Sequence, residues 1–164
     1  MKPTTGFDRR PASFVLAPLA AILFQVYVPR FFELGKYLEL PMLVVVYFSL
    51  MRRHAVIGTL FGCAVGLVQD SLSHQPLGIF GIVKTLTGYF AASLSLKIDA
   101  DNPAVRLFLS AFFFLFHQFF YWVMVRALLG QDLQLQLIET FVLAVLNAAI
   151  ALPLFTLFDK LRIK

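Results

Sequence analysis

Six polar residues lie inside or at the edge of long apolar stretches and are the first candidates for chemistry. They are Asp70, Lys84, His117, Gln118, Glu139 and Asn147. An ionisable side chain within a membrane costs roughly 3 kcal/mol on insertion scales, so it faces protein or water and frequently marks a functional site. The chemistry open to this set is ion pairing inside the protein or recognition of a polar solute or partner.

Lys84 is the most costly of these residues, because it lies about seven positions into an apolar stretch. We expect it to pair with Asp70, with Glu139 or with carbonyl groups at a helix end. Depth favours Glu139, since both residues lie about one and a half turns from the same membrane face. A structural ion pair is the favoured interpretation, and solute or partner recognition is the alternative.

Asp70 follows Gln69 at the end of the third apolar stretch and precedes the polar turn Ser71–Pro76. A carboxylate at this position can cap the next helix or accept hydrogen bonds from the amides of the turn. This structural role is favoured over binding of a ligand or partner.

The remaining polar residues predict hydrogen bonding and no metal site. His117 and Gln118 lie in a segment rich in phenylalanine, and a lone histidine there is usually a hydrogen-bonded interior residue. No second histidine or cysteine stands at metal-ligand spacing. Asn147 is expected to form hydrogen bonds between helices.

Three glycines at four-residue spacing, Gly58, Gly62 and Gly66, leave one helix face without side chains. Another backbone can therefore approach this face closely. Packing within the protein is the favoured interpretation, and packing against a partner's helix is the alternative.

No catalytic motif is present, so we expect neither an enzyme nor a cofactor. Ser71, Ser73 and His74 lie near Asp70, but adjacency in a turn does not make a triad, which needs a base positioned on its nucleophile. Nucleophile elbows, phosphate loops, zinc motifs and nucleotide fingerprints are also missing from the sequence.

The composition predicts that the polar candidate residues lie on membrane helices. The chain has 164 residues, 60% of them hydrophobic, and a mean hydropathy of +0.82, which no water-soluble fold could bury. The net charge of +5 shows no basic stripe suited to nucleic acid and is better explained by membrane topology. Cys63, the single cysteine, is expected to act as a buried small hydrophobe.

We expect an all-α integral membrane protein whose six transmembrane helices form one polytopic domain, residues 1–164. The approximate helix ranges are 12–28, 38–51, 55–70, 77–96, 105–129 and 135–158. The first stretch resembles a signal peptide, but no cleavage site follows it, so we expect it to remain as a helix. The second covers only about 20 Å of a core about 30 Å thick, so it must thin the bilayer, use flanking residues or be shielded by neighbours.

The distribution of Lys and Arg predicts that both termini are cytoplasmic, because short cytoplasmic loops carry an excess of positive charge. The side that holds the N-terminus carries ten cations: Lys2, Arg9, Arg10, Arg52, Arg53, Lys97, Arg106, Lys160, Arg162 and Lys164. The opposite side carries Arg30, Lys36 and Arg126.

A series of short motifs runs from Gly58 to Tyr89. It comprises Gly62, Gly66-Leu-Val-Gln-Asp70, Pro76-Leu-Gly78, Gly81, Lys84-Thr85 and Gly88-Tyr89. In this order the motifs resemble the MreD family, the small membrane subunit of the bacterial rod-shape and cell-wall elongation machinery. Leu40-Pro41, which leads into a Val-rich helix ending at Arg52-Arg53, extends the resemblance loosely to most of the chain.

The resemblance implies a non-catalytic subunit of the bacterial inner membrane that acts with MreC, MreB, RodA and a class B penicillin-binding protein in lateral wall synthesis. MreC is the expected direct partner, through its transmembrane helix. The expected fold also resembles that of the six-helix substrate-binding subunits of vitamin transporters, which share its size, and this looser likeness implies no function.

Two functions therefore stay open. The first is a scaffold that contacts its partners through the glycine face and the turn Asp70–Gly81. The motif residues are then Gly58, Gly62, Gly66, Asp70, Pro76, Gly78, Gly81, Gly88 and Tyr89. The second is a small-solute-binding transporter subunit with a pocket lined by Lys84, Glu139, His117 and Asn147.

Overall fold

The structure is a computed structural model that describes residues 11–31, 35, 37–73, 76–134 and 136–163. Several cations of the topology prediction lie outside the described residues: Lys2, Arg9, Arg10, Lys36 and Lys164. The same holds for His74 and for the side chains of Arg30 and Arg162.

In the described residues, six α-helices follow one another, and a short 3-10 helix, η1, comes after the first. They are α1 Pro11–Tyr27, η1 Val28–Arg30, α2 Leu40–Arg52, α3 Ala55–Leu72, α4 Ile79–Leu94, α5 Pro103–Leu129 and α6 Leu137–Ile163. Each α-helix corresponds to one predicted stretch; most ends differ by one or two residues, and α6 continues to Ile163. The described part of the chain contains no β-strand, so the all-helical prediction is confirmed.

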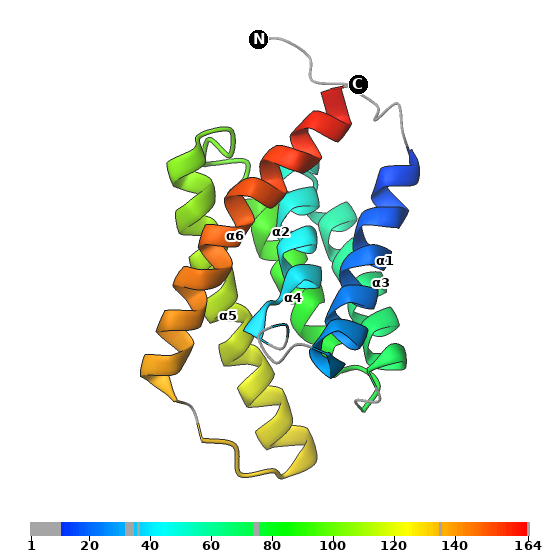
Figure 1. The fold of residues 1–164 in the computed structure, drawn as a ribbon, viewed down its shortest axis with the longest axis vertical. Helices are drawn as coiled ribbons and strands as arrows, with labels where there is room; N and C mark the ends of the chain where they lie inside the picture. The colour runs from blue at the N-terminus through cyan, green and yellow to red at the C-terminus, as the bar shows by residue number, and fades with distance from the viewer. Residues whose placement is uncertain (1–10, 32–34, 36, 74–75, 135, 164) are drawn as a thin grey trace.

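Within the part of the chain that the structure describes, three helices are long and apolar enough to cross a membrane: α3, α5 and, over Leu137–Lys160, α6. The other three are shorter apolar helices, so six crossings stay a prediction. Successive helices run in alternating directions, and α1 begins at the same end of the bundle at which α6 ends (Figure 1). At the opposite end, the last turns of α5 extend beyond the other helices (Figure 1).

Helix α2 occupies the centre of the bundle (Figure 1). Residues 41–50 are all buried, which agrees with their continuous apolar sequence, since a helix that is hydrophobic on every side belongs in a core. Helices α1, α3, α4 and α5 pack around it, and from α6 the ring of Phe155 lies 5.2 Å from that of Tyr47. Of the three ways to accommodate this short helix, the structure uses shielding by neighbours.

Helices α3 and α4 make the closest backbone contact of the fold, along three glycines of α3. A methyl group added at Gly58, Gly62 or Gly66 would collide with the carbonyl oxygen of Gly88, Lys84 or Phe80 of α4, respectively. The two helices run antiparallel, so each glycine of α3 faces one of these three α4 residues. These three contacts fix the rotation of α4 about its axis. The Lys84 backbone therefore lies against α3, and its side chain is fully buried in the bundle.

Candidate functional site

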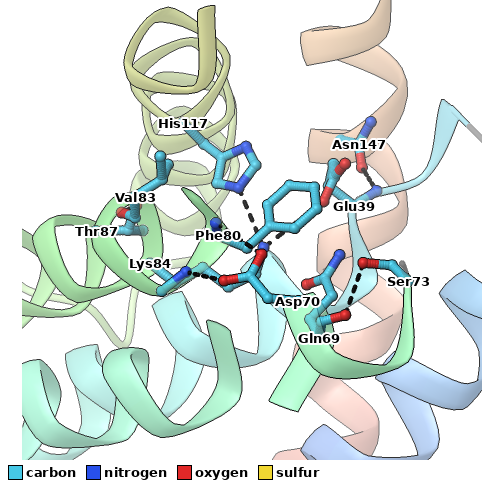
Figure 2. Close-up of polar contacts among 11 residues, drawn as sticks. Glu39, Gln69, Asp70, Ser73, Phe80, Val83, Lys84, Thr87, His117 and Asn147 are labelled. Atoms are coloured by element: carbon cyan, nitrogen blue, oxygen red, sulfur yellow. Dashed lines mark hydrogen bonds and ion pairs between the residues drawn. The ribbon is translucent and has the colours of Figure 1, made fainter. Parts of the chain in front are cut away.

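Four ionisable side chains from different parts of the chain converge inside the bundle. They are Glu39 just before α2, Asp70 of α3, Lys84 of α4 and His117 of α5, and we call them the central polar cluster (Figure 2). Lys84 and His117 are both 0% exposed, and Asp70 is 1% exposed. The glycine contact between α3 and α4 brings Asp70 and Lys84 to this point.

The ammonium group of Lys84 is held by several contacts. Its Nζ lies 3.2 Å from Nε2 of His117 and 4.0 Å from Oε2 of Glu39, and it stands 4.4 Å from the centroid of the Phe80 ring. The carboxylates of Glu39 and Asp70 both attract it electrostatically. When Lys84 is charged it can only donate, so we assign Nε2 of His117 as the acceptor in a neutral imidazole whose proton lies on Nδ1. That nitrogen is buried and has no hydrogen-bond partner among the described residues.

Asp70 organises the turn between α3 and α4. Its carboxylate accepts hydrogen bonds from the backbone amides of Gly78 at 2.9 Å, Phe80 at 3.0 Å and Gly81 at 3.0 Å. These donors include free amides of the first turn of α4, which otherwise have no partner within the helix. Gly78 has φ of 107°, a conformation that favours glycine. Both contacts expected of Asp70, with the turn and with the start of the next helix, are present.

Asn147 of α6 fixes the segment that leads into α2. Its Oδ1 accepts a hydrogen bond from the backbone amide of Glu39 at 2.9 Å, and its Nδ2 donates to the carbonyl oxygen of Tyr37 at 2.9 Å. The polar contact predicted for Asn147 therefore exists, but it joins α6 to the segment before α2 rather than to another α-helix. This contact positions Glu39 beside Lys84.

The preference for Glu139 as the partner of Lys84 is wrong. Glu139 lies exposed in the first turn of α6, whereas the carboxylate within ion-pair distance of Lys84 is that of Glu39. Depth along a helix does not determine which face a residue occupies, so two residues at similar depth can point apart. The predicted pocket of Lys84, Glu139, His117 and Asn147 accordingly lacks its glutamate, and Gln118 is half-buried beside His117.

Glu39 was not among the candidates, because it closes a charged stretch that also contains Arg30 and Glu33. One signal distinguishes it from those neighbours. Glu39 is followed directly by the uninterrupted apolar segment of α2. Because α2 is short and central, the residue that precedes it also lies in the interior of the bundle.

The central polar cluster lies near the middle of α5. Arg106 and Arg126 are about 30 Å apart along this helix at 1.5 Å per residue, which is the thickness of a bilayer core. His117 lies about halfway between them. Near the far end, Trp122 donates to the carbonyl oxygen of Leu133, and Arg126 pairs with Asp132 at 3.3 Å. An indole and an arginine at this level are typical of a membrane interface.

A second buried polar site lies at the opposite end of the bundle and was not predicted. Asp159 of α6 accepts a hydrogen bond from the hydroxyl of Tyr47 at 2.7 Å and pairs with Arg106. Arg106 also donates from Nε to the carbonyl oxygen of Ala100 at 2.7 Å. The contacts join α2, α5, α6 and the loop before α5. In the sequence, Arg106 and Asp159 stand at the ends of apolar stretches and look like ordinary flanking charges.

The other motif residues lie around the joint of α3 and α4. Gly81 and Gly88 are buried, whereas Pro76 and Tyr89 are exposed. On the outer surface, a shallow apolar groove runs between the two helices. It is lined by Cys63, Leu67, Gly78, Gly81, Ile82, Thr85 and Leu86. Cys63 is half-buried at this groove rather than fully buried.

The fold and the site define a small helical membrane protein with a closed polar centre. The described residues contain no group of three or more metal-ligating side chains. The chain belongs to the MreD family, because the family described as rod shape-determining protein MreD matches residues 9–164, nearly its whole length. Neither a curated protein nor a solved structure matches it. The chain is thus a membrane protein of a family of shape-determining proteins.

Proposed function

We propose that the chain is a non-catalytic subunit of the bacterial cell-wall elongation complex, which binds MreC and helps to organise the peptidoglycan synthases. Its membership of the MreD family carries this proposal. The further partners are RodA, a class B penicillin-binding protein and MreB. Nearly all described residues belong to six helices joined by short connections, so helix faces and turns are the surfaces available for binding.

We place the chain in the bacterial cytoplasmic membrane with six crossings and both termini in the cytoplasm. Two observations support this topology. The start of α1 and the end of α6 lie at one end of the bundle (Figure 1). Arg52 and Arg53 at the α2–α3 turn, and Lys97 after α4, lie at helix ends on that same side, as expected for cytoplasmic loops.

We propose that the transmembrane helix of MreC packs against the outer surface of α3 and α4. The glycine face itself is covered by α4, so the accessible part of the motif region is the apolar groove beside it. Small residues such as Cys63, Gly78 and Thr85 along this groove permit the close backbone approach that drives helix association in lipid.

The test is affinity purification of the tagged chain from native membranes in mild detergent, followed by mass spectrometry of the proteins that remain bound. Near-stoichiometric MreC, together with elongation enzymes, is the expected result. Recovery of an ATPase module with a membrane coupling subunit would instead identify a transporter subunit.

Variants then locate the contact. Thr85→Leu narrows the groove and should lower the recovery of MreC, with rounding of rod-shaped cells that depend on this chain. Val145→Leu, at an exposed position of α6, is the matched control and should leave both readouts unchanged. Equal recovery of MreC with the two variants would exclude the groove as the contact.

A further inference from the structure

The central polar cluster contains more negative than positive charge if both of its carboxyl groups are ionised. Lys84 contributes one positive charge, Asp70 and Glu39 one negative charge each, and His117 is neutral because its Nε2 faces the ammonium group. The remainder is one net negative charge in the interior of the helix bundle. An uncompensated ion is strongly disfavoured there, and such groups are neutralised by binding a proton.

We infer that the central polar cluster binds a proton on the carboxyl group of Glu39. The resting cluster then consists of the Lys84 ammonium, the Asp70 carboxylate and two neutral groups, Glu39 and His117, and its net charge is zero. This inference concerns the interior of the chain and goes beyond the proposed function, since it does not require any partner.

Hydrogen bonding shows which carboxyl group holds the proton. Asp70 accepts three backbone hydrogen bonds, all of which favour its ionised form. Oε2 of Glu39 is buried and has no hydrogen-bond partner within the described part of the chain, and its distance of 4.0 Å from Lys84 Nζ is too long for a hydrogen bond. Glu39 precedes α2, yet its side chain forms no capping bond with that helix.

The groups that face Glu39 or Lys84 come from four helices. Among the described residues, Lys84 of α4, Tyr121 of α5 and the uncharged Asn147 of α6 interact with Glu39 itself, whereas Asp70 of α3 and His117 of α5 lie on the other contacts of Lys84. Lys84 is the one cation among them, and Asp70 shares it. If Glu39 and Asp70 were both ionised, Lys84 would therefore be the single counter-ion for two carboxylates.

The geometry also gives the bound proton a consequence. The side chain of Glu39 is 14% exposed, whereas that of Lys84 is 0% exposed, so Glu39 lies nearer to the surface of the bundle than Lys84 does. Its backbone amide is fixed by Asn147, so loss of the proton draws the Lys84 ammonium toward Glu39 and away from His117. Proton binding is in this way coupled to the contact between α4 and α5.

Infrared difference spectroscopy of the full chain in lipid bilayers tests the inference. A carbonyl band of a protonated carboxylic acid should be present at neutral pH and should disappear as the pH is raised. It should be lost in Glu39→Gln and kept in Glu139→Gln, the matched control at an exposed glutamate. Absence of the band from the unmodified chain, or its persistence in Glu39→Gln, would overturn the inference.

A second measurement covers the case in which the band is too weak to assign. A folded state that binds one proton more than the unfolded state loses stability as the pH rises. The thermal unfolding midpoint should therefore fall between neutral and alkaline pH in the unmodified chain and in Glu139→Gln. The fall should be smaller in Glu39→Gln, which remains neutral at every pH. An equal fall in Glu39→Gln and Glu139→Gln would contradict proton binding at Glu39.

Discussion

Replacing Gly62 by alanine tests the packing that positions Lys84. The added methyl carbon would lie 2.7 Å from the Lys84 carbonyl carbon and 3.2 Å from Cα of Thr85, and distances under 3.0 Å are essentially never seen for real Cβ atoms. The obstacle is backbone, so no side-chain rotation can relieve it. Helices α3 and α4 would have to separate along the whole line of glycines.

The expected cost follows from two opposing effects. Overpacking of a tight core costs typically about 1–3 kcal/mol. Alanine favours a helix over glycine by roughly 1 kcal/mol, which offsets part of this cost. Because the obstacle is backbone and no side chain can move aside, the upper part of the overpacking range, about 2–3 kcal/mol, applies here. The net loss of about 1–2 kcal/mol should lower the ratio of folded to unfolded chain by a factor of roughly 5–30.

Unfolding in mixed micelles with a rising fraction of sodium dodecyl sulfate, followed by circular dichroism, measures this loss. Ala64→Leu is the control, because Ala64 lies exposed on the same helix. The midpoint should fall for Gly62→Ala and stay near the unmodified value for Ala64→Leu. If Gly62→Ala unfolds no earlier than Ala64→Leu, the close contact between α3 and α4 is refuted.

Three further predictions use the same unfolding assay. Asp70→Asn should lower stability by about 1.5–3 kcal/mol, because an amide nitrogen cannot accept the hydrogen bonds that hold the start of α4; an unchanged midpoint would contradict this role. Lys84→Met should cost about 3–5 kcal/mol by leaving the Asp70 charge buried without its counter-ion, and the Lys84→Met, Asp70→Asn double variant should lose less than the sum of the single losses. Tyr47→Phe should cost about 0.5–1.5 kcal/mol through loss of its hydrogen bond to Asp159, and a larger loss would mean that the hydroxyl has further partners.

The features that could be predicted from the sequence are those set by local properties. Runs of apolar residues between charges locate all six helices, and a carboxylate between a helix and a glycine-containing turn indicates the capping role of Asp70. The glycine spacing likewise predicts a close helix contact. Each of these depends on residues within a few turns of one another.

The features that could not be predicted depend on helix rotation and on long-range proximity. Lys84 and Glu139 have similar depths, but only the contact of Gly62 with the Lys84 backbone decides where the lysine points. Glu39 reaches it because Asn147, far along the chain, holds the segment before α2. The pairing of Tyr47 and Arg106 with Asp159 has the same origin, since it requires α2, α5 and α6 to meet.

The complete enclosure of α2 has a consequence for biogenesis. A helix about 20 Å long is too short to remain stably in a bilayer core of about 30 Å by itself. Its interior position is completed by Phe155 and Asp159 of α6, which are synthesised after the other five helices. The nascent chain therefore has to keep α2 protected until α6 arrives, and a chain interrupted before α6 should be recognised as incomplete by membrane proteases.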